Sequence, residues 1–289
     1  SNTGDIYLLT GGDITNTAAA IAVNGDINFN GNNITQRGVL TAGSTTGDIT
    51  VIGDVSLIGT GTVTNSGEVT ATGDISFTGT ELSNNTGGTL NAGNNVSLDA
   101  SAGLTNDAEI NAGYDVIFNA GKTITNSGAI TAEDDILFTA GEAINNAGVL
   151  SAQDDIIFIA GKNIANTSTA AISTGGAVQF IANESVSNKS AITAESIKMD
   201  AGTNIVNEGN ILTAQEDITL TAEGDVTNNA SITSDYGNIT VSGSKVEQKQ
   251  TVAANTGSIT MTAKDTLTTS GNIHGQLGVE LTANSTLTT

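Results

Sequence analysis

The sequence predicts an all-β protein, and within that class a right-handed parallel β-helix with three short strands in each turn. Three observations lead to this fold class. The composition disfavours helices, a repeat of about twenty residues runs along the whole chain, and side chains inside each repeat alternate with a period of two.

The composition is that of a β protein. Among 289 residues there are 35 glycines and no proline, and aromatic residues make up 3%. β-Branched residues and turn formers dominate, whereas the helix formers Leu, Lys, Arg and Met are scarce. The hydrophobic fraction of 37% is regularly placed, which separates the chain from disordered sequences. The lack of cysteine excludes disulfides and thiolate metal sites.

One position of the repeat is marked by an apolar residue, any residue and then Asn or a polar substitute. Successive copies are about 19 to 22 residues apart. The interval from Gln36 to Asn65 is longer, and the stretch GDITVI within it looks like an inserted strand or bulge. The column comprises Asn16, Gln36, Asn65, Asn84, Asn106, Asn126, Asn146, Asn166, Asn188, Asn207, Asn228, Gln248 and Thr269.

Each repeat holds three segments of about three to five residues, separated by Gly, Asn and Asp. They are too short for amphipathic helices, so three strands with tight corners form one turn of a coil. About thirteen turns at a strand spacing of about 4.8 Å give a rod of roughly 60 Å, right-handed like most β-crossover-β connections. We expect residues 1–289 to form a single β-helix domain, irregular near residues 47–58, that is a fragment of a longer shaft.

All six phenylalanines occupy one slot of the repeat, two residues after an Ile or Val, and in other turns that slot holds Leu, Met or Val. We therefore predict an interior column of stacked apolar side chains, with small alanines in the corner that follows. The phenylalanines are Phe29, Phe77, Phe118, Phe138, Phe158 and Phe180, and the alanines are Ala120, Ala140, Ala160 and Ala182.

The asparagine column has two interpretations. Stacked amides can hydrogen-bond to one another along the axis as an interior or corner ladder. The alternative is a ligand-binding row, which requires amides that face solvent near charged groups.

The charge balance restricts the partners. The chain has 8 basic and 30 acidic residues and a formal charge of −22, which disfavours nucleic acid and anionic membrane surfaces. No run approaches eighteen apolar residues, so we expect no membrane insertion.

Residues 120–150, AGKTITNSGAITAEDDILFTAGEAINNAGVL, resemble the repeats of filamentous haemagglutinin. The matching features are the roughly twenty-residue period, the apolar-x-Asn-x-Gly turn and the Ala-Gly-x-Asp-[Ile/Val] joint, and they cover essentially the whole chain. Such repeats belong to exoproteins of two-partner secretion, which include adhesins, haemolysins and contact-dependent inhibition effectors. The resemblance implies export through an outer-membrane transporter and a location in the secreted fraction or at the bacterial cell surface. It carries no active residues over, because a shaft repeat has none, and the chain resembles a piece of the shaft.

The sequence favours a protein that is not an enzyme. Arg37 is the only arginine and His274 the only histidine, and most connections are too short to wall a catalytic cleft. We expect His274, in GNIHGQ, to be a surface turn residue. No cofactor is indicated, apart from a candidate calcium site.

That candidate consists of aspartates at one position of successive turns, Asp115, Asp135 and Asp155, with Asp134 and Asp154 beside them. In one interpretation each carboxylate bonds its own corner backbone as an Asx-turn, and water screens the charge. In the other the carboxylates bind Ca²⁺ through oxygen ligands.

The charge of the residue after Ala-Gly alternates along the chain, with Lys122, Glu142 and Lys162 in successive repeats. Glu184 follows at the same position, after Ala-Asn. We expect these four side chains to stack in adjacent turns as a ladder of opposite charges.

The middle residue of the first strand should face solvent, and in most turns it is polar. In the middle of the chain this position is aliphatic in three successive repeats. Two further aliphatic residues stand two positions later in their segments. We predict that these five form one exposed patch that packs against another rod or a partner module, although β-propensity alone explains them equally well. The polar residues are Asn28, Thr50, Ser56, Ser76, Ser97, Thr219, Thr240 and Thr260, and the aliphatic ones are Ile117, Leu137, Ile157, Ile159 and Ile181.

These observations favour a structural or adhesive shaft. Its expected partners are a receptor on a host or neighbouring cell, or another copy of the fibre. The alternative is a carbohydrate-binding or tailspike-like β-helix, which would expose aromatic residues for stacking on sugars. Tyr7, Tyr114 and Tyr236 are the candidates for that role.

Overall fold

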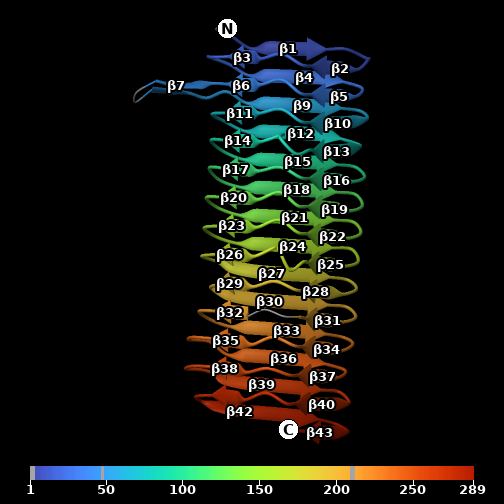
Figure 1. The fold of residues 1–289 in the computed structure, drawn as a ribbon, viewed down its shortest axis with the longest axis vertical. Coiled ribbons are helices and arrows are strands. Elements are labelled where there is room, and N and C mark those ends of the chain that lie inside the picture. The colour runs from blue at the N-terminus through green and yellow to red at the C-terminus, as the bar shows by residue number, and fades with distance from the viewer. Residues whose placement is uncertain (1–3, 47–48, 209–211) are drawn as a thin grey trace. The chain divides into compact units, whose positions relative to one another are not determined.

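The computed structural model describes residues 4–46, 49–208 and 212–289, and these residues form strands, turns and bends without any helix. Within them no helix has the length and apolarity needed to cross a membrane. The chain divides into two compact units, residues 1–141 and 142–289. Each unit is a β-solenoid in which every turn contributes one strand to each of three parallel sheets (Figure 1). The all-β parallel β-helix predicted from sequence is confirmed.

The first unit contains the following strands. Its first sheet consists of β1 (Ile6–Leu9), β4 (Ile27–Gly31), β9 (Val55–Gly59), β12 (Ile75–Gly79), β15 (Val96–Ala100), β18 (Val116–Ala120) and β21 (Ile136–Ala140). Its second sheet consists of β2 (Ile14–Asn16), β5 (Ile34–Gln36), β10 (Thr62–Asn65), β13 (Glu81–Asn84), β16 (Leu104–Asn106) and β19 (Ile124–Asn126). Its third sheet consists of β3 (Ala20–Ala22), β6 (Leu40–Ala42), β11 (Val69–Ala71), β14 (Leu90–Ala92), β17 (Ile110–Ala112) and β20 (Ile130–Ala132).

The second unit repeats the same order. Its first sheet consists of β24 (Ile156–Ala160), β27 (Ala177–Ala182), β30 (Ser196–Ala201), β33 (Ile218–Ala222), β36 (Ile239–Gly243), β39 (Ser258–Ala263) and β42 (Gly278–Ala283). Its second sheet consists of β22 (Ile144–Asn146), β25 (Ile164–Asn166), β28 (Val186–Asn188), β31 (Ile205–Asn207), β34 (Val226–Asn228), β37 (Val246–Gln248), β40 (Thr266–Thr269) and β43 (Thr286–Thr288). Its third sheet consists of β23 (Leu150–Ala152), β26 (Ile172–Thr174), β29 (Ile192–Ala194), β32 (Leu212–Ala214), β35 (Ile232–Ser234), β38 (Val252–Ala254) and β41 (Ile273–Gly275).

Taken together the two units make about 14 turns, one more than the sequence indicates. The additional turn ends in β43, where Leu287 is followed by Thr289 as Leu267 is followed by Thr269. The column defined from the sequence stops at Thr269 and omits this last copy, although β43 pairs with β40 in the same register.

The predicted phenylalanine column is confirmed. All six rings are at most 2% exposed, and each lies opposite another ring or a Leu on a neighbouring strand of its unit. Phe118 and Phe138 stack with centroids 4.8 Å apart, whereas Phe158 meets Phe180 edge to face at 4.7 Å. The four predicted alanines are also buried in the corner after each long strand. Burial of such a ring contributes about 1.5–3 kcal/mol.

The asparagine column forms an interior ladder. In the second unit Asn188 donates to Asn207 at 2.8 Å, and Asn207 donates to Asn228 at 2.6 Å. The second N–H of Asn188 donates to the carbonyl of Ser190, so this amide bonds its own corner as well as the adjacent turn. The second sheet of the first unit repeats this arrangement. Because these amides are at most 2% exposed from the third turn onward, the solvent-facing ligand row considered above is wrong.

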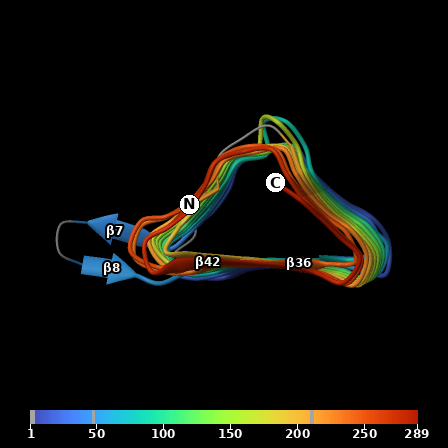
Figure 2. The ribbon, with the colours of Figure 1, turned by 90° about the horizontal axis from the view of Figure 1, so that it is seen from below.

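The sequence also indicates an inserted strand or bulge after Gln36, and the structure shows two paired strands of a hairpin there. Strands β7 (Ser44–Thr46) and β8 (Ile49–Val51) pair antiparallel and form a separate two-stranded sheet. The hairpin projects from the corner between the third and first sheets of the first unit (Figure 2).

Candidate functional site

The outer face of the first sheet is polar in most turns, as predicted. Its half-exposed middle positions lie between two buried apolar neighbours on each strand. They are Asn28, Ser56, Ser76 and Ser97 in the first unit and Thr219, Thr240 and Thr260 in the second. The prediction for Thr50 is wrong, because Thr50 lies in β8 of the hairpin and not in the first sheet. The sequence of β8 alternates apolar and polar residues as a first-sheet strand does.

Aliphatic side chains interrupt this polar face in both units. In the first unit Ile117 and Leu137 are directly opposite each other on β18 and β21, and both are half-buried. In the second unit Ile159 is 39% exposed and lies opposite Ile181, whereas Ile157 lies opposite the polar Gln179. Each unit thus presents its own small apolar area, of two and three side chains respectively.

The corner before each first-sheet strand of the first unit carries a side-chain oxygen, and these oxygens form a ladder. In the first unit the backbone N–H of Asp54 donates to Asp26 Oδ1 at 2.9 Å, and that of Asp74 donates to Asp54 Oδ1 at 2.8 Å. Asn95 takes the same place one turn further on. The carboxylates of Asp26 and Asp54 therefore accept from the adjacent turn, a donor that the Asx-turn interpretation does not include. The stacking of turns brings this second donor within reach.

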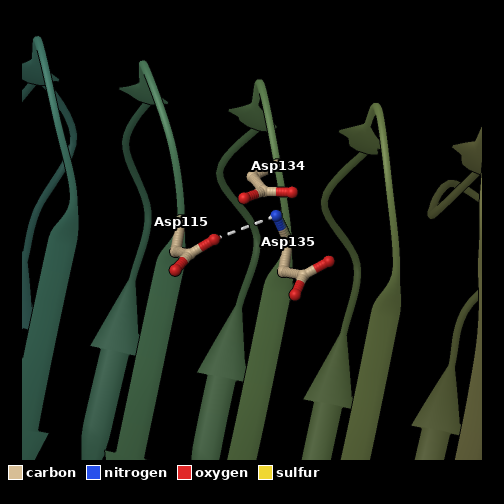
Figure 3. Close-up of side chains that lie close together, drawn as sticks. All are labelled: Asp115, Asp134 and Asp135. Atoms are coloured by element: carbon tan, nitrogen blue, oxygen red, sulfur yellow. Dashed lines mark hydrogen bonds between the residues drawn. The ribbon is translucent and has the colours of Figure 1, made fainter.

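The candidate calcium ligands lie on this ladder (Figure 3). Asp115, Asp134 and Asp135 each offer an oxygen, and the three oxygens lie within 4.8 Å of one another. One oxygen of Asp115 also accepts the backbone N–H of Asp135 at 3.2 Å. Asp155, the third predicted ligand, belongs to the second unit and accepts the N–H of Ala177 at 2.7 Å. Oxygen atoms at these separations suit a hard cation such as Ca²⁺. They equally suit three half-buried carboxylates that are hydrated and hydrogen-bonded.

The predicted charge ladder includes one ion pair in the second unit. Lys162 Nζ lies 3.4 Å from Glu142 Oε1, and each side chain is nearly half exposed. Backbone hydrogen bonds join Glu142 to Lys162 and Lys162 to Glu184, so the three residues are stacked in adjacent turns. Glu184 accepts from the Asn163 amide at 3.0 Å. Lys122 belongs to the first unit, where its N–H donates to the carbonyl of Ala102. A continuous ladder of all four charges stays a prediction.

A second corner ladder precedes the second sheet. Asp13 Oδ1 accepts the backbone N–H of Asn33 and the side-chain amides of Asn33 and Asn32. These donors lower the pKa of the Asp13 carboxyl, the backbone N–H of Asn33 most of all, because they stabilise its charged form.

At β1 a pKa is raised. The hydrogen bond that Tyr7 donates to Asp5, and the charge of that carboxylate, raise the pKa of the Tyr7 phenol.

The residues considered for catalysis or sugar binding are dispersed. His274 is exposed, but it lies in strand β41 opposite Ala253, and not in a turn as predicted. Tyr7, Tyr114 and Tyr236 are 66%, 55% and 74% exposed, and they lie in different turns. Among the described residues, aromatic side chains form no row on which a sugar chain could stack.

The haemagglutinin repeat, a family of repeated sequence units, matches residues 66–138, 212–276 and 232–289, which together are just over half of the chain. No curated protein and no solved structure is detectably similar to the chain.

Proposed function

Because this chain belongs to the haemagglutinin repeat family, we propose that it is part of the shaft of a secreted bacterial surface fibre. The observation that carries this proposal is the uniform filling of the coils. In the turns between the first and the last, similar residues stack in columns, mostly Phe or Leu, Ile or Val, Ala and Asn, and are buried against the turn beside them. Such a repeat is stabilised by its nearest neighbours and can be extended without limit, which suits a spacer that holds a surface away from the cell.

The family supports a structural and adhesive role for the chain. From this role we propose its location, its export route and its partners. We assign the protein to the secreted fraction or the outer surface, with export through an outer-membrane transporter. Its binding partners in this proposal are a receptor on a host or neighbouring cell, or another copy of the fibre. The repetitive outer faces, with short corners between them, suit this role better than an enzymatic one.

The adhesive contact in this proposal is the aliphatic area of the first sheet. Ile117 with Leu137, and Ile157 with Ile159 and Ile181, are neutral areas on a chain whose charge is −22. Apolar side chains gathered on an otherwise polar face are typical of contact surfaces. The acidic residues elsewhere keep the remaining faces from associating.

Two experiments test the proposal. With its transporter co-expressed, antibody should label the chain on intact cells, and electron microscopy should show fibres. Removal of residues 218–238 deletes one turn and joins Asp217 to Ile239 in register, so the shortened chain should still fold with the same β spectrum and be exported. Protein that stays inside the cell, or a deletion variant that unfolds, would contradict the shaft.

The second experiment addresses the contact area. Ile117→Thr, Leu137→Thr and Ile157→Thr together should leave the melting temperature nearly unchanged and weaken association in sedimentation. Ser56→Thr, Ser76→Thr and Ser97→Thr change three equivalent positions of the same face and serve as the matched control. Equal association of both variants would show that the aliphatic residues only reflect strand preference.

A further inference from the structure

The β7–β8 hairpin is inserted between two adjacent corner positions of an otherwise complete turn. Gly43 and Gly53, which flank it, still bond to the neighbouring turns: Gly43 N–H donates to Ala22, and Gly53 accepts from Gly73 N–H. Removal of residues 44–52 would join the two glycines. The resulting Ala-Gly-Gly-Asp-Val has the form of the joint found in other turns, such as Ala-Gly-Tyr-Asp-Val at residues 112–116. The hairpin is therefore an addition to the coil and not part of its stacking.

The base of the hairpin is fixed to the coil by Thr72 of the next turn. The Thr72 hydroxyl donates to the carbonyl of Val51 at 2.7 Å and accepts the N–H of Gly53 at 3.0 Å. Gly43 has a φ of 74°, which glycine adopts readily, and a Cβ there would lie 1.8 Å from Thr72 Oγ1. The two glycine backbones also touch, since a Cβ on Gly53 would lie 2.3 Å from Gly43 N. These contacts let the chain leave and re-enter the coil at one point.

The hairpin leaves two strand edges open. Among the described residues neither β7 nor β8 pairs with a third strand. Thr45, Thr46 and Thr50 are exposed, and Ile52 at the base is 58% exposed. Proteins protect such edges by short strand length, lysine, proline or bulges; β7 and β8 are three residues long and contain neither lysine nor proline. An open edge that projects from the coil is a template on which another extended chain can pair (Figure 2).

The charges around the hairpin indicate what kind of chain fits. Its base lies beside the carboxylate ladder of Asp26, Asp54 and Asp74. The inserted segment contains one charged residue, Asp48, which is also acidic. Two copies of the hairpin would bring these carboxylates together, so the surroundings disfavour self-pairing and favour a basic partner.

We propose that the β7–β8 hairpin is a docking site for an extended basic segment of a partner protein, which adds to an open edge as a further strand. Backbone hydrogen bonds would hold the added strand, and lysine or arginine side chains at its ends would face the carboxylate ladder. This site is separate from the aliphatic area of the first sheet. It can be present or absent without any change in the shaft function.

A binding experiment with a synthetic peptide tests the proposal. The probe alternates Thr with Val over six residues and carries two Lys at each end. One matched peptide carries Glu in place of Lys, and another carries Pro at two of the central positions. Binding is measured by fluorescence anisotropy to the whole chain and to the variant that lacks residues 44–52. The melting temperature of this variant should stay within a few degrees of the wild-type value, because the coil is complete without the hairpin.

The whole chain should bind the Lys peptide at least ten-fold more tightly than either matched peptide, and removal of the hairpin should abolish this binding. Equal binding to the excised variant would overturn the proposal, since the peptide would then bind the acidic surface in general. No preference over the Pro peptide would overturn strand addition. Wild-type dimers in sedimentation that disappear on excision would overturn it in favour of a second copy. If the excised variant does not fold, Thr45→Pro and Thr50→Pro together in the whole chain, which block both β7 and β8 as edges, must abolish binding for the proposal to stand.

Discussion

The interior amide ladder and the corner carboxylate ladder use similar hydrogen bonds in opposite surroundings. In the interior Asn188 donates to Asn207 Oδ1 at 2.8 Å, and both residues are completely buried. At the corner Asp135 N–H donates to Asp115 Oδ1 at 3.2 Å, and both carboxylates are half-buried. In each column a side-chain oxygen joins one turn to the next at the repeat period.

The difference between the two columns shows what burial requires. A buried group must be neutral, and in a ladder it must both donate and accept, which an amide does and a carboxylate does not. At the corner the donor is a backbone N–H and water can solvate the second oxygen, so Asp and Asn are both suitable there. The sequence agrees: the interior column contains Asn, Gln or Thr, whereas the corner column of the first unit consists of Asp with a single Asn, Asn95.

The largest effect is expected from a carboxylate in the interior ladder. In Asn207→Asp a buried charge replaces the amide that donates to Asn228, and two oxygens then face each other. We expect a loss of about 3–5 kcal/mol in the free energy of unfolding at neutral pH. Burial raises the pKa of the new carboxyl above its unfolded value, so the loss should shrink as pH falls towards about 4. Urea unfolding at pH 7 and pH 4 measures both effects.

The reverse exchange at the corner provides the matched control. Asp135→Asn keeps an oxygen at a half-buried position and should change the stability by less than about 0.5 kcal/mol. If Asn207→Asp were as mild as Asp135→Asn, burial would not be the cause of the difference between the columns.

A smaller effect is expected when the corner oxygen is removed. Asp115→Ala deletes the acceptor of the Asp135 N–H and should cost about 0.5–1.5 kcal/mol, whereas Asp115→Asn should restore most of that loss. Thermal unfolding of the two variants distinguishes a hydrogen-bonding role from simple charge. If Asp115→Ala were more stable than the wild type, repulsion among the carboxylates would outweigh the hydrogen bond.

Calcium binding is a further test of the difference between the two ladders, because only the corner ladder has carboxylates to offer as ligands. If Asp115, Asp134 and Asp135 bind Ca²⁺, a millimolar concentration of the ion should raise the melting temperature, and Asp135→Asn should abolish the increase. Hydrated corner carboxylates predict no shift in either protein. Mg²⁺ at the same ionic strength controls for general screening of the charge of −22.

The sequence predicts the interior better than the corners, for a physical reason. Phe118 and Asn106 belong to columns in which one residue type recurs at a fixed period, so their burial and stacking could be predicted from spacing alone. The partner of Asp54 could not, because its donor comes from the adjacent turn and depends on the register of the coil. Thr50 was misplaced because a hairpin strand carries the same alternation as a first-sheet strand. The hairpin departs from the period, so the repeat contains no information about its shape.

The smallest effect is expected at the outer surface, where Lys162 lies 3.4 Å from Glu142. Both side chains are nearly half exposed, so water and salt screen their attraction, and Lys162→Glu should cost at most about 1 kcal/mol. A second change, Glu142→Lys, restores opposite charges with their order exchanged. The double variant should therefore recover most of the loss at low salt, and the recovery should fade at 1 M NaCl. Unfolding of both single variants and the double variant gives the coupling energy. A coupling of zero at low salt would show that the alternation of charge does not contribute to the pairing of these turns.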